Sequence, residues 1–94
     1  MIAKFAIIFS VKAKHRKTLA AIFAKPTRAN IIFADIEALF VALGGEVVEG
    51  AGSRITMELN DSRAHFHRPH PSKEAKKYQV ENAREFLERQ EITP

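Results

Sequence analysis

Residues 52–70 alternate between apolar and polar side chains, and this alternation restricts the possible folds more than any other feature of the sequence. Side chains in a strand point to opposite faces in turn, so the stretch predicts two strands with one apolar face each. The apolar residues are Ile55, Met57, Leu59, Ala64 and Phe66. The residues of the opposite face are Arg54, Thr56, Glu58, Arg63, His65 and His67. Such a sheet requires helices behind it and leaves its polar face open to a ligand, so this face is the candidate site.

Asn60 and Asp61 stand between the two strands, and both residue types tolerate the positive φ that a two-residue hairpin turn requires. This turn brings the apolar residues of both strands to one face. It also predicts three polar cross-strand pairs, which are Glu58 with Arg63, Thr56 with His65, and Arg54 with His67. A four-residue turn would keep the faces and shift the pairs. A second two-residue turn, at Ala51 and Gly52, would place Glu49 opposite Arg54.

Helices are predicted on both sides of these strands. The clearest covers residues 35–43, where an apolar stripe recurs at helical spacing and Gly44 and Gly45 supply the stop. A second helix is predicted at residues 77–90, and a short one at 17–25, before Pro26. Residues 46–49 are predicted to form a further strand. The fold class is therefore α+β, with helix, three antiparallel strands and helix in that order and the helices packed on one face of the sheet.

A chain of 94 residues is long enough for one domain and one core. We assign residues 17–94 to a single domain and residues 1–16 to an N-terminal extension. The first eleven residues are apolar and too short to span a bilayer. We interpret them as an added segment, strand or helix rather than as a secretion signal, because they resemble a cleavage site only loosely.

The formal net charge of +4 and the pI near 9.7 favour a polyanionic partner. The positive charge is concentrated near the N-terminus, because seven Lys and Arg side chains precede the first acid, Asp35. A solvated arm and a nucleic-acid contact both explain this pattern. The chain has no cysteine, which excludes disulfides and a cysteine-ligated zinc site and fits a reducing cytosol.

Histidine and arginine on one sheet face suit the cleavage of RNA without a metal ion. Histidine titrates near working pH, so His65 and His67 could supply the base and the acid. Arginine binds phosphate in a bidentate manner, and Arg54, Arg63 and Arg68 are near in sequence. Two alternatives remain open. The face could be ordinary solvated surface, and the H-x-H-x-x-H spacing of residues 65–70 could hold zinc, although no fourth ligand is evident.

From about residue 32 to residue 92, the chain resembles the HicA family of toxins from bacterial toxin–antitoxin systems. The matching features are the helix DIEALFVALGG, the strand EVVEG, the turn and strand GSRITMEL, the exit FHRPH and the closing helix VENAREFLERQEI. The resemblance implies a fold like that of double-stranded-RNA-binding domains. It also implies mRNA cleavage that arrests translation, and neutralisation by a HicB antitoxin.

The chain departs from the family pattern at one position. In the family, the glycine–serine pair that opens the second strand precedes the histidine taken to be catalytic. Here Gly52 and Ser53 precede Arg54, which stays protonated and cannot act as a general base. Either His67 has taken over proton transfer while Arg54 holds the phosphate, or the chain binds RNA without cutting it. A third hypothesis is a protein-interaction domain whose polar face is filled by a HicB-like partner.

We therefore expect a cytoplasmic endoribonuclease that requires no metal or cofactor. Its expected partners are mRNA and a HicB-like antitoxin, and no membrane is involved. The residues expected to act in catalysis are His67, His65 and Arg54. The residues expected to bind RNA are Ser53, Arg63, Arg68, His70, Lys73, Lys76 and Lys77. The alternative is a catalytically silent RNA-binding or antitoxin-binding module of the same fold.

Overall fold

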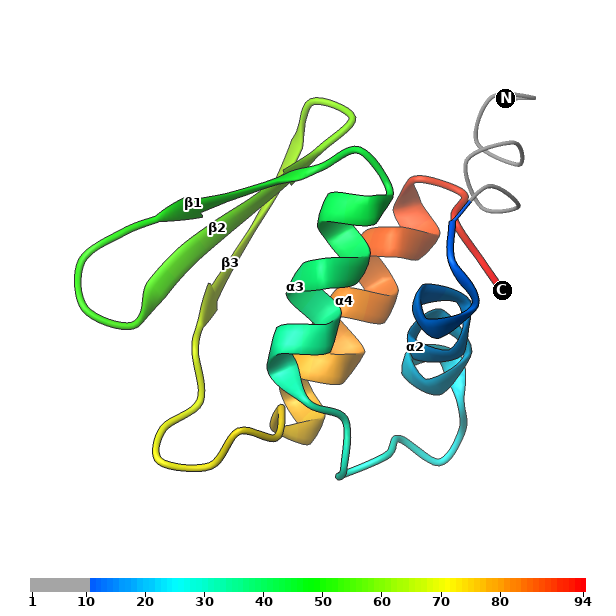
Figure 1. Ribbon diagram of the computed structural model, residues 1–94, viewed down its shortest axis with the longest axis horizontal. Coiled ribbons are helices and arrows are strands. Elements are labelled where there is room, and N and C mark those ends of the chain that lie inside the picture. The colour runs from blue at the N-terminus through cyan, green and yellow to red at the C-terminus, as the bar shows by residue number, and fades with distance from the viewer. Residues whose placement is uncertain (1–10) are drawn as a thin grey trace.

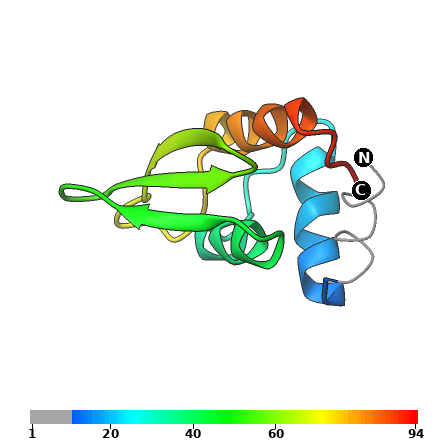
Figure 2. The same cartoon turned by 90° about the horizontal axis from the view of Figure 1, so that it is seen from above.

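A computed structural model describes residues 11–94, which form three helices and three strands. In chain order these are α2 (Ala13–Phe23), α3 (Phe33–Ala42), β1 (Glu46–Glu49), β2 (Arg54–Leu59), β3 (Ser62–His67) and α4 (Lys77–Arg89). The strands form one antiparallel sheet in the order β1-β2-β3 (Figure 1). Helices α3 and α4 cover one face of this sheet, and α2 packs against both helices on their far side (Figure 2). The predicted α-β-β-β-α fold is confirmed.

The hairpin of β2 and β3 has the predicted two-residue turn. Asn60 and Asp61 adopt φ values of 52° and 63°, in the left-handed region that this turn demands. The three predicted polar pairs form as expected, and they are Glu58 with Arg63, Thr56 with His65, and Arg54 with His67. The apolar residues of both strands therefore face the helices, while the polar pairs face away from them.

The loop between β1 and β2 differs from our prediction. Glu49 pairs with Ile55 and not with Arg54. The cause is a wider turn, in which the Arg54 N–H donates to the Ala51 carbonyl (3.1 Å) and the Gly50 N–H donates to the Arg54 carbonyl (2.9 Å). A shift by one residue reverses the faces of a strand. Glu49 thus lies on the helix side of the sheet, and Val48 lies on the polar side.

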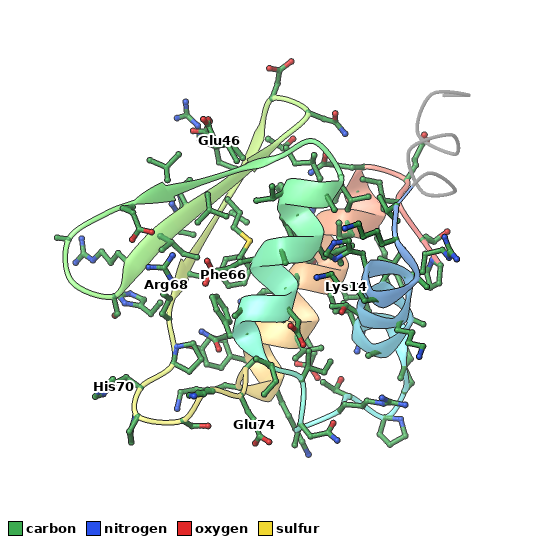
Figure 3. All side chains as sticks on the ribbon, in the orientation of Figure 1. Lys14, Glu46, Phe66, Arg68, His70 and Glu74 are labelled. Atoms are coloured by element: carbon green, nitrogen blue, oxygen red, sulfur yellow. The ribbon has the colours of Figure 1, made fainter. Side chains whose placement is uncertain are left out.

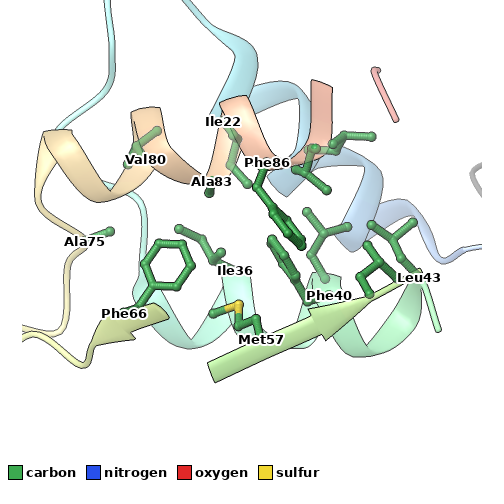
Figure 4. Close-up of a cluster of buried hydrophobic side chains, with 14 of the residues drawn as sticks. Ile22, Ile36, Phe40, Leu43, Met57, Phe66, Ala75, Val80, Ala83 and Phe86 are labelled. Atoms are coloured by element: carbon green, nitrogen blue, oxygen red, sulfur yellow. The ribbon is translucent and has the colours of Figure 1, made fainter. Parts of the chain in front are cut away.

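The core lies between the sheet and the two helices that cover it (Figure 4). Phe40 of α3 stacks on Phe86 of α4, with ring centroids 5.6 Å apart and an interplanar angle of 16°. Phe33 meets Phe66 of β3 edge-on at 5.9 Å. Full burial of such a side chain contributes about 1.5–3 kcal/mol. These two aromatic pairs tie α3 to α4 and to the sheet.

Helix α2 begins at Ala13, four residues before the predicted start, so residues 13–16, which we assigned to the N-terminal extension, belong to this helix. Its residues Leu19 and Ile22 are buried. Arg84 of α4 donates hydrogen bonds to the carbonyls of Ile22 (2.9 Å) and Ala24 (3.3 Å), which a helix leaves unpaired at its C-terminus. Our interpretation of the first ten residues lies outside the described part of the chain. No helix in residues 11–94 has the length and apolarity needed to cross a membrane.

Candidate active site

The outer face of β2 and β3 brings four of the residues singled out in the sequence close together. His65, His67 and Arg54 are exposed there, and Thr56 is half-buried between the strands. The Arg68 N–H donates to the Ser53 carbonyl at 2.8 Å, which makes Arg54 and His67 a non-hydrogen-bonded strand pair. Side chains in such pairs are the closer ones, with Cβ atoms about 4.5–5.5 Å apart. A guanidinium and an imidazole can therefore contact the same small group.

Each histidine of this face pairs through Nδ1 with a hydroxyl of the neighbouring chain segment. Thr56 Oγ1 lies 3.0 Å from Nδ1 of His65. Ser53 Oγ lies 3.3 Å from Nδ1 of His67. Because Nδ1 is occupied in both rings, Nε2 is the nitrogen left for a substrate, and the second hydrogen bond orients the ring. The two Cα atoms are about 7 Å apart along the strand, so the two Nε2 atoms can flank a phosphate.

A hollow of about 510 Å³ lies over this part of the sheet. Its lining residues are Gly50, Ala51, Arg54, Ile55, Thr56, His65, Phe66 and His67. The loop between β1 and β2 forms one wall, since Gly50 and Ala51 belong to it. A phosphodiester placed there would meet two imidazoles and one guanidinium, which is the set of groups that metal-free RNA cleavage requires.

The structure places Arg63 and Arg68 apart from this hollow. Arg63 lies near the hairpin turn, and its Nε is 3.1 Å from Oε2 of Glu58. Arg68 lies on the helix side of the sheet (Figure 3), where it donates four hydrogen bonds of 2.7–3.0 Å to the carboxylates of Glu37 and Glu49. Hydrogen bonding to Arg68 lowers the pKa of Glu49, and both carboxylates raise the pKa of Arg68.

The remaining predicted RNA contacts follow β3 and lie away from the outer face. Figure 3 shows His70 pointing outward from the segment that leaves the sheet. This segment then runs antiparallel to the approach to α3, where the Lys73 carbonyl accepts the Phe33 N–H at 2.9 Å. Lys76 and Lys77 start α4, and the side chains of all four basic residues are exposed. They form a second group of positive charges, separate from the hollow.

The predicted zinc alternative finds no support in the described part of the chain. Within residues 11–94, no three His, Cys, Asp or Glu side chains come close enough together to hold a metal ion. Arg54 also has no ion pair to Glu49 or Glu58 in this range, because these carboxylates bind Arg68 and Arg63 instead. The guanidinium of Arg54 therefore stands beside His67 without a carboxylate that would neutralise it.

Comparison with known protein families identifies the family of this chain. Residues 33–88 match the family model described as the HicA toxin of bacterial toxin–antitoxin systems. The chain belongs to the HicA toxin family. The match runs from α3 to α4 and includes the whole sheet, so the resemblance inferred from the sequence is confirmed. Helix α2 precedes the matched region. No curated protein and no solved structure matches the chain.

Sequence reasoning missed one residue of this HicA-family site, the buried Gln79 of α4. Its Nε2 donates to the His67 carbonyl at 2.7 Å, and its Oε1 accepts the Lys76 N–H at 3.0 Å. One amide thus links the end of β3 to the first turn of α4. The position of Gln79 in the sequence could have indicated its burial. It stands one residue before Val80 and four before Ala83, on the apolar stripe of the helix.

Sequence reasoning also missed the ion-pair cluster of Glu37, Arg68 and Glu49. Its three members come from α3, from the segment after β3 and from β1. The side chain of Glu37 is only 17% exposed, so the cluster is partly shielded from water. No pattern in the sequence pointed to it, because the predicted register of β1 placed Glu49 on the opposite face.

Proposed function

We propose that this HicA-family chain cleaves mRNA at the outer face of β2 and β3 without a metal ion. The observation that carries this proposal is the pairing of His67 with Arg54, directly beside the pair of His65 and Thr56, on a face open to solvent. Membership of the toxin family supports the class of activity. The resemblance noted in the sequence implies that the cleaved RNA is mRNA.

One histidine acts as the base and the other as the acid in a single displacement at phosphorus. One imidazole takes the proton of the ribose 2′-OH while that oxygen attacks the phosphorus. The other imidazole gives a proton to the 5′ oxygen while its bond to phosphorus breaks. Arg54 stabilises the charge that builds up on the phosphoryl oxygens, which a permanently protonated guanidinium does well. The products are a 2′,3′-cyclic phosphate and a 5′-hydroxyl.

The other basic residues hold the RNA on either side of the hollow. In this proposal Ser53 and Arg63 contact the RNA backbone at the two ends of the hairpin. The second group of positive charges extends the path that the RNA follows. The residues of that second group are His70, Lys73, Lys76 and Lys77. Arg68 would bind phosphate only by exchanging a carboxylate for it, so its main part is to hold Glu37 and Glu49.

The same face is also the surface that an antitoxin must block. We propose that a HicB-like antitoxin covers the hollow and supplies acidic groups to Arg54 and Arg63, as electrostatic complementarity at an interface requires. A toxin that acts on translated mRNA works in the cytoplasm. Coexpression of a HicB-like antitoxin should relieve the growth arrest that the chain causes.

Two single substitutions test the proposal. Removal of a general acid or base costs about 10²–10⁴-fold in rate, so His67→Ala and His65→Ala should abolish both growth arrest and cleavage of labelled RNA in EDTA. His15→Ala, on α2, is the matched control, because it removes a histidine on the far side of the helices and should cleave like the wild type. Wild-type cleavage by both sheet variants would contradict the proposal.

The position of Arg54 favours a second candidate function, an RNA-binding module that does not cleave. This candidate predicts salt-sensitive RNA binding and no cleavage products at any pH or with any metal ion. Arg54→His separates the two candidates. In a silent module, the substitution restores the family histidine and should create cleavage activity. In the nuclease that we propose, it removes the phosphate-binding cation and should lower the cleavage rate.

A further inference from the structure

We propose that α2 and the segment after it form a second anion-binding surface, which holds the phosphate backbone of RNA on the side of the molecule away from the sheet. The inference rests on the proposed function in one respect, that RNA is the ligand. The surface is defined by Lys14, Lys17 and Arg28. It belongs to the part of the chain that precedes the HicA match.

The charged residues in and around α2 are all basic. Residues 11–34 contain no acid, and the first acid is Asp35. The Lys and Arg side chains of this stretch are Lys12, Lys14, Arg16, Lys17, Lys25 and Arg28. All six are exposed, whereas Arg63, Arg68 and Arg89 in the later part of the chain are paired with carboxylates. The net positive charge of the described residues thus comes entirely from residues 11–34, because residues 35–94 contain more acidic than basic side chains.

Helix stability does not explain these residues. The first turn of α2 contains Lys14, His15 and Arg16, with no acid and no side-chain cap. The N-terminus of a helix carries a partial positive charge, so a cation there is unfavourable by about 0.3–1 kcal/mol. Arg16 does contribute to the fold, because it donates to the Val11 carbonyl at 2.7 Å. For Lys14 the structure gives no such bond within residues 11–94, so a bound anion is the group that would compensate its charge.

The three defining cations surround two neighbouring hollows between α2 and the start of α3. One hollow, of about 230 Å³, includes Lys17 and Arg28 in its lining. The other, of about 90 Å³, includes Lys14. Asp35 contributes to both hollows and is the one acid among the residues that line them. Among residues 11–94, Lys14, Lys17 and Arg28 form no ion pair. Three cations beside two small hollows fit successive phosphates of a flexible strand.

The position of this surface determines what it can do. The layer of α3 and α4 separates α2 from the sheet (Figure 2), and the longest dimension of the molecule is 38 Å. A short RNA in the hollow over β2 and β3 cannot reach α2. A long RNA can pass around the molecule and bind both surfaces, and this second attachment raises its overall affinity without any change at the first. The α2 surface should thus favour long RNA over short RNA.

Binding of non-cleavable 2′-O-methyl RNA tests this inference separately from cleavage. We compare an oligomer of about six nucleotides with one of about fifty. The test variant is K14Q/K17Q/R28Q, and the matched control is K73Q/K76Q/K77Q, which removes three charges from the separate group that follows β3. Circular dichroism confirms that each variant is folded, and the single variant Lys17→Glu repeats the test with a smaller change.

The test variant should bind the long RNA about tenfold more weakly and the short RNA within twofold of the wild type. Three lost phosphate contacts should also lower the slope of log affinity against log salt by about 2. The control variant should weaken both RNAs alike. Unchanged binding of long RNA by the test variant would overturn the α2 surface, whether or not the protein cleaves RNA. If His67→Ala loses cleavage and still binds long RNA, both proposals are supported. If the wild type binds long RNA through α2 and never cleaves it, only the proposed function is overturned.

Discussion

Gln79 of α4 donates a hydrogen bond from Nε2 to the carbonyl of His67 at 2.7 Å, and its side chain is almost fully buried. Its Oε1 is held by the Lys76 N–H, so the amide cannot rotate without breaking both bonds. The last residue of β3 is therefore fixed by the first turn of a helix. His67 receives its position from this contact as much as from its strand pair with Arg54.

Gln79→Leu should lower the free energy of unfolding by about 1–3 kcal/mol, because it leaves the Lys76 N–H and the His67 carbonyl without their partly buried hydrogen-bond partner. Urea denaturation measures this effect. The RNA cleavage rate should also fall in the folded variant, since His67 loses its support.

Gln90→Leu provides the matched control, because Gln90 is a buried glutamine at the opposite end of the same helix. The side-chain nitrogen and oxygen of Gln90 are buried without a hydrogen-bond partner among the described residues. Replacing an unsatisfied amide with an apolar side chain of similar volume should be neutral or stabilising by about 1 kcal/mol. A loss of stability equal to that of Gln79→Leu would show that volume, and not hydrogen bonding, explains both results.

The ion pair of Arg68 and Glu49 should make stability depend on acid pH. Hydrogen bonding to Arg68 lowers the pKa of Glu49 below its ordinary value of 4.5. The carboxylate therefore favours the folded state fully above this value, and the contribution disappears as the pH falls through the lowered pKa. The melting temperature of Glu49→Gln should change less than that of the wild type when the pH falls below about 4.5. Parallel melting curves for the two proteins would contradict this assignment.

Gly45→Ala should destabilise the protein more than Gly44→Ala. A Cβ on Gly45 would lie 2.6 Å from the Glu58 carbonyl oxygen and 2.9 Å from that of Phe40, and both are backbone atoms that cannot move aside. We expect a loss of about 2–3 kcal/mol from this overpacking. Gly44 has a φ of +96° and open space around it, so alanine there adds only backbone strain of about 1 kcal/mol. Thermal unfolding of the two variants gives the comparison.

Removal of the hydroxyls that contact the histidines should slow RNA cleavage. Thr56→Val and Ser53→Ala each delete the partner of one Nδ1 atom, and the imidazole then loses its fixed orientation. We expect a decrease of about tenfold in each single-turnover rate. With a short RNA that cannot reach α2, Thr18→Val, which removes a hydroxyl bonded to the Lys14 carbonyl, should have no effect. Equal rates in all three variants would assign no role to the hydroxyls.

Local sequence patterns were sufficient to predict the hairpin and its two faces. Alternation placed Ile55, Met57 and Phe66 against the helices, and the turn at Asn60 and Asp61 set the register. Both signals arise within a few residues, so no distant contact is needed to interpret them. The same reasoning predicted correctly which polar residues would oppose one another on the outer face.

The parts that could not be predicted depend on contacts between distant segments. The register of Glu49 follows from a backbone hydrogen bond between Arg54 and Ala51, which leaves no trace in residue type. The environment of Arg68 follows in turn from that register, because Glu49 reaches Arg68 only on the helix side of the sheet. Gln79 had a positional signal, but its partner is a main-chain carbonyl, which any residue at position 67 would supply.

Helix α4 supports two neighbouring elements, α2 and β3. Arg84, near its middle, holds the end of α2, and Gln79, in its first turn, holds the end of β3. A displacement of α4 along its own axis would therefore move both attachments together. The strand that carries His65 and His67 and the helix that carries Lys14 and Lys17 are both held by α4. A ligand that displaces either element therefore exerts force on the same helix.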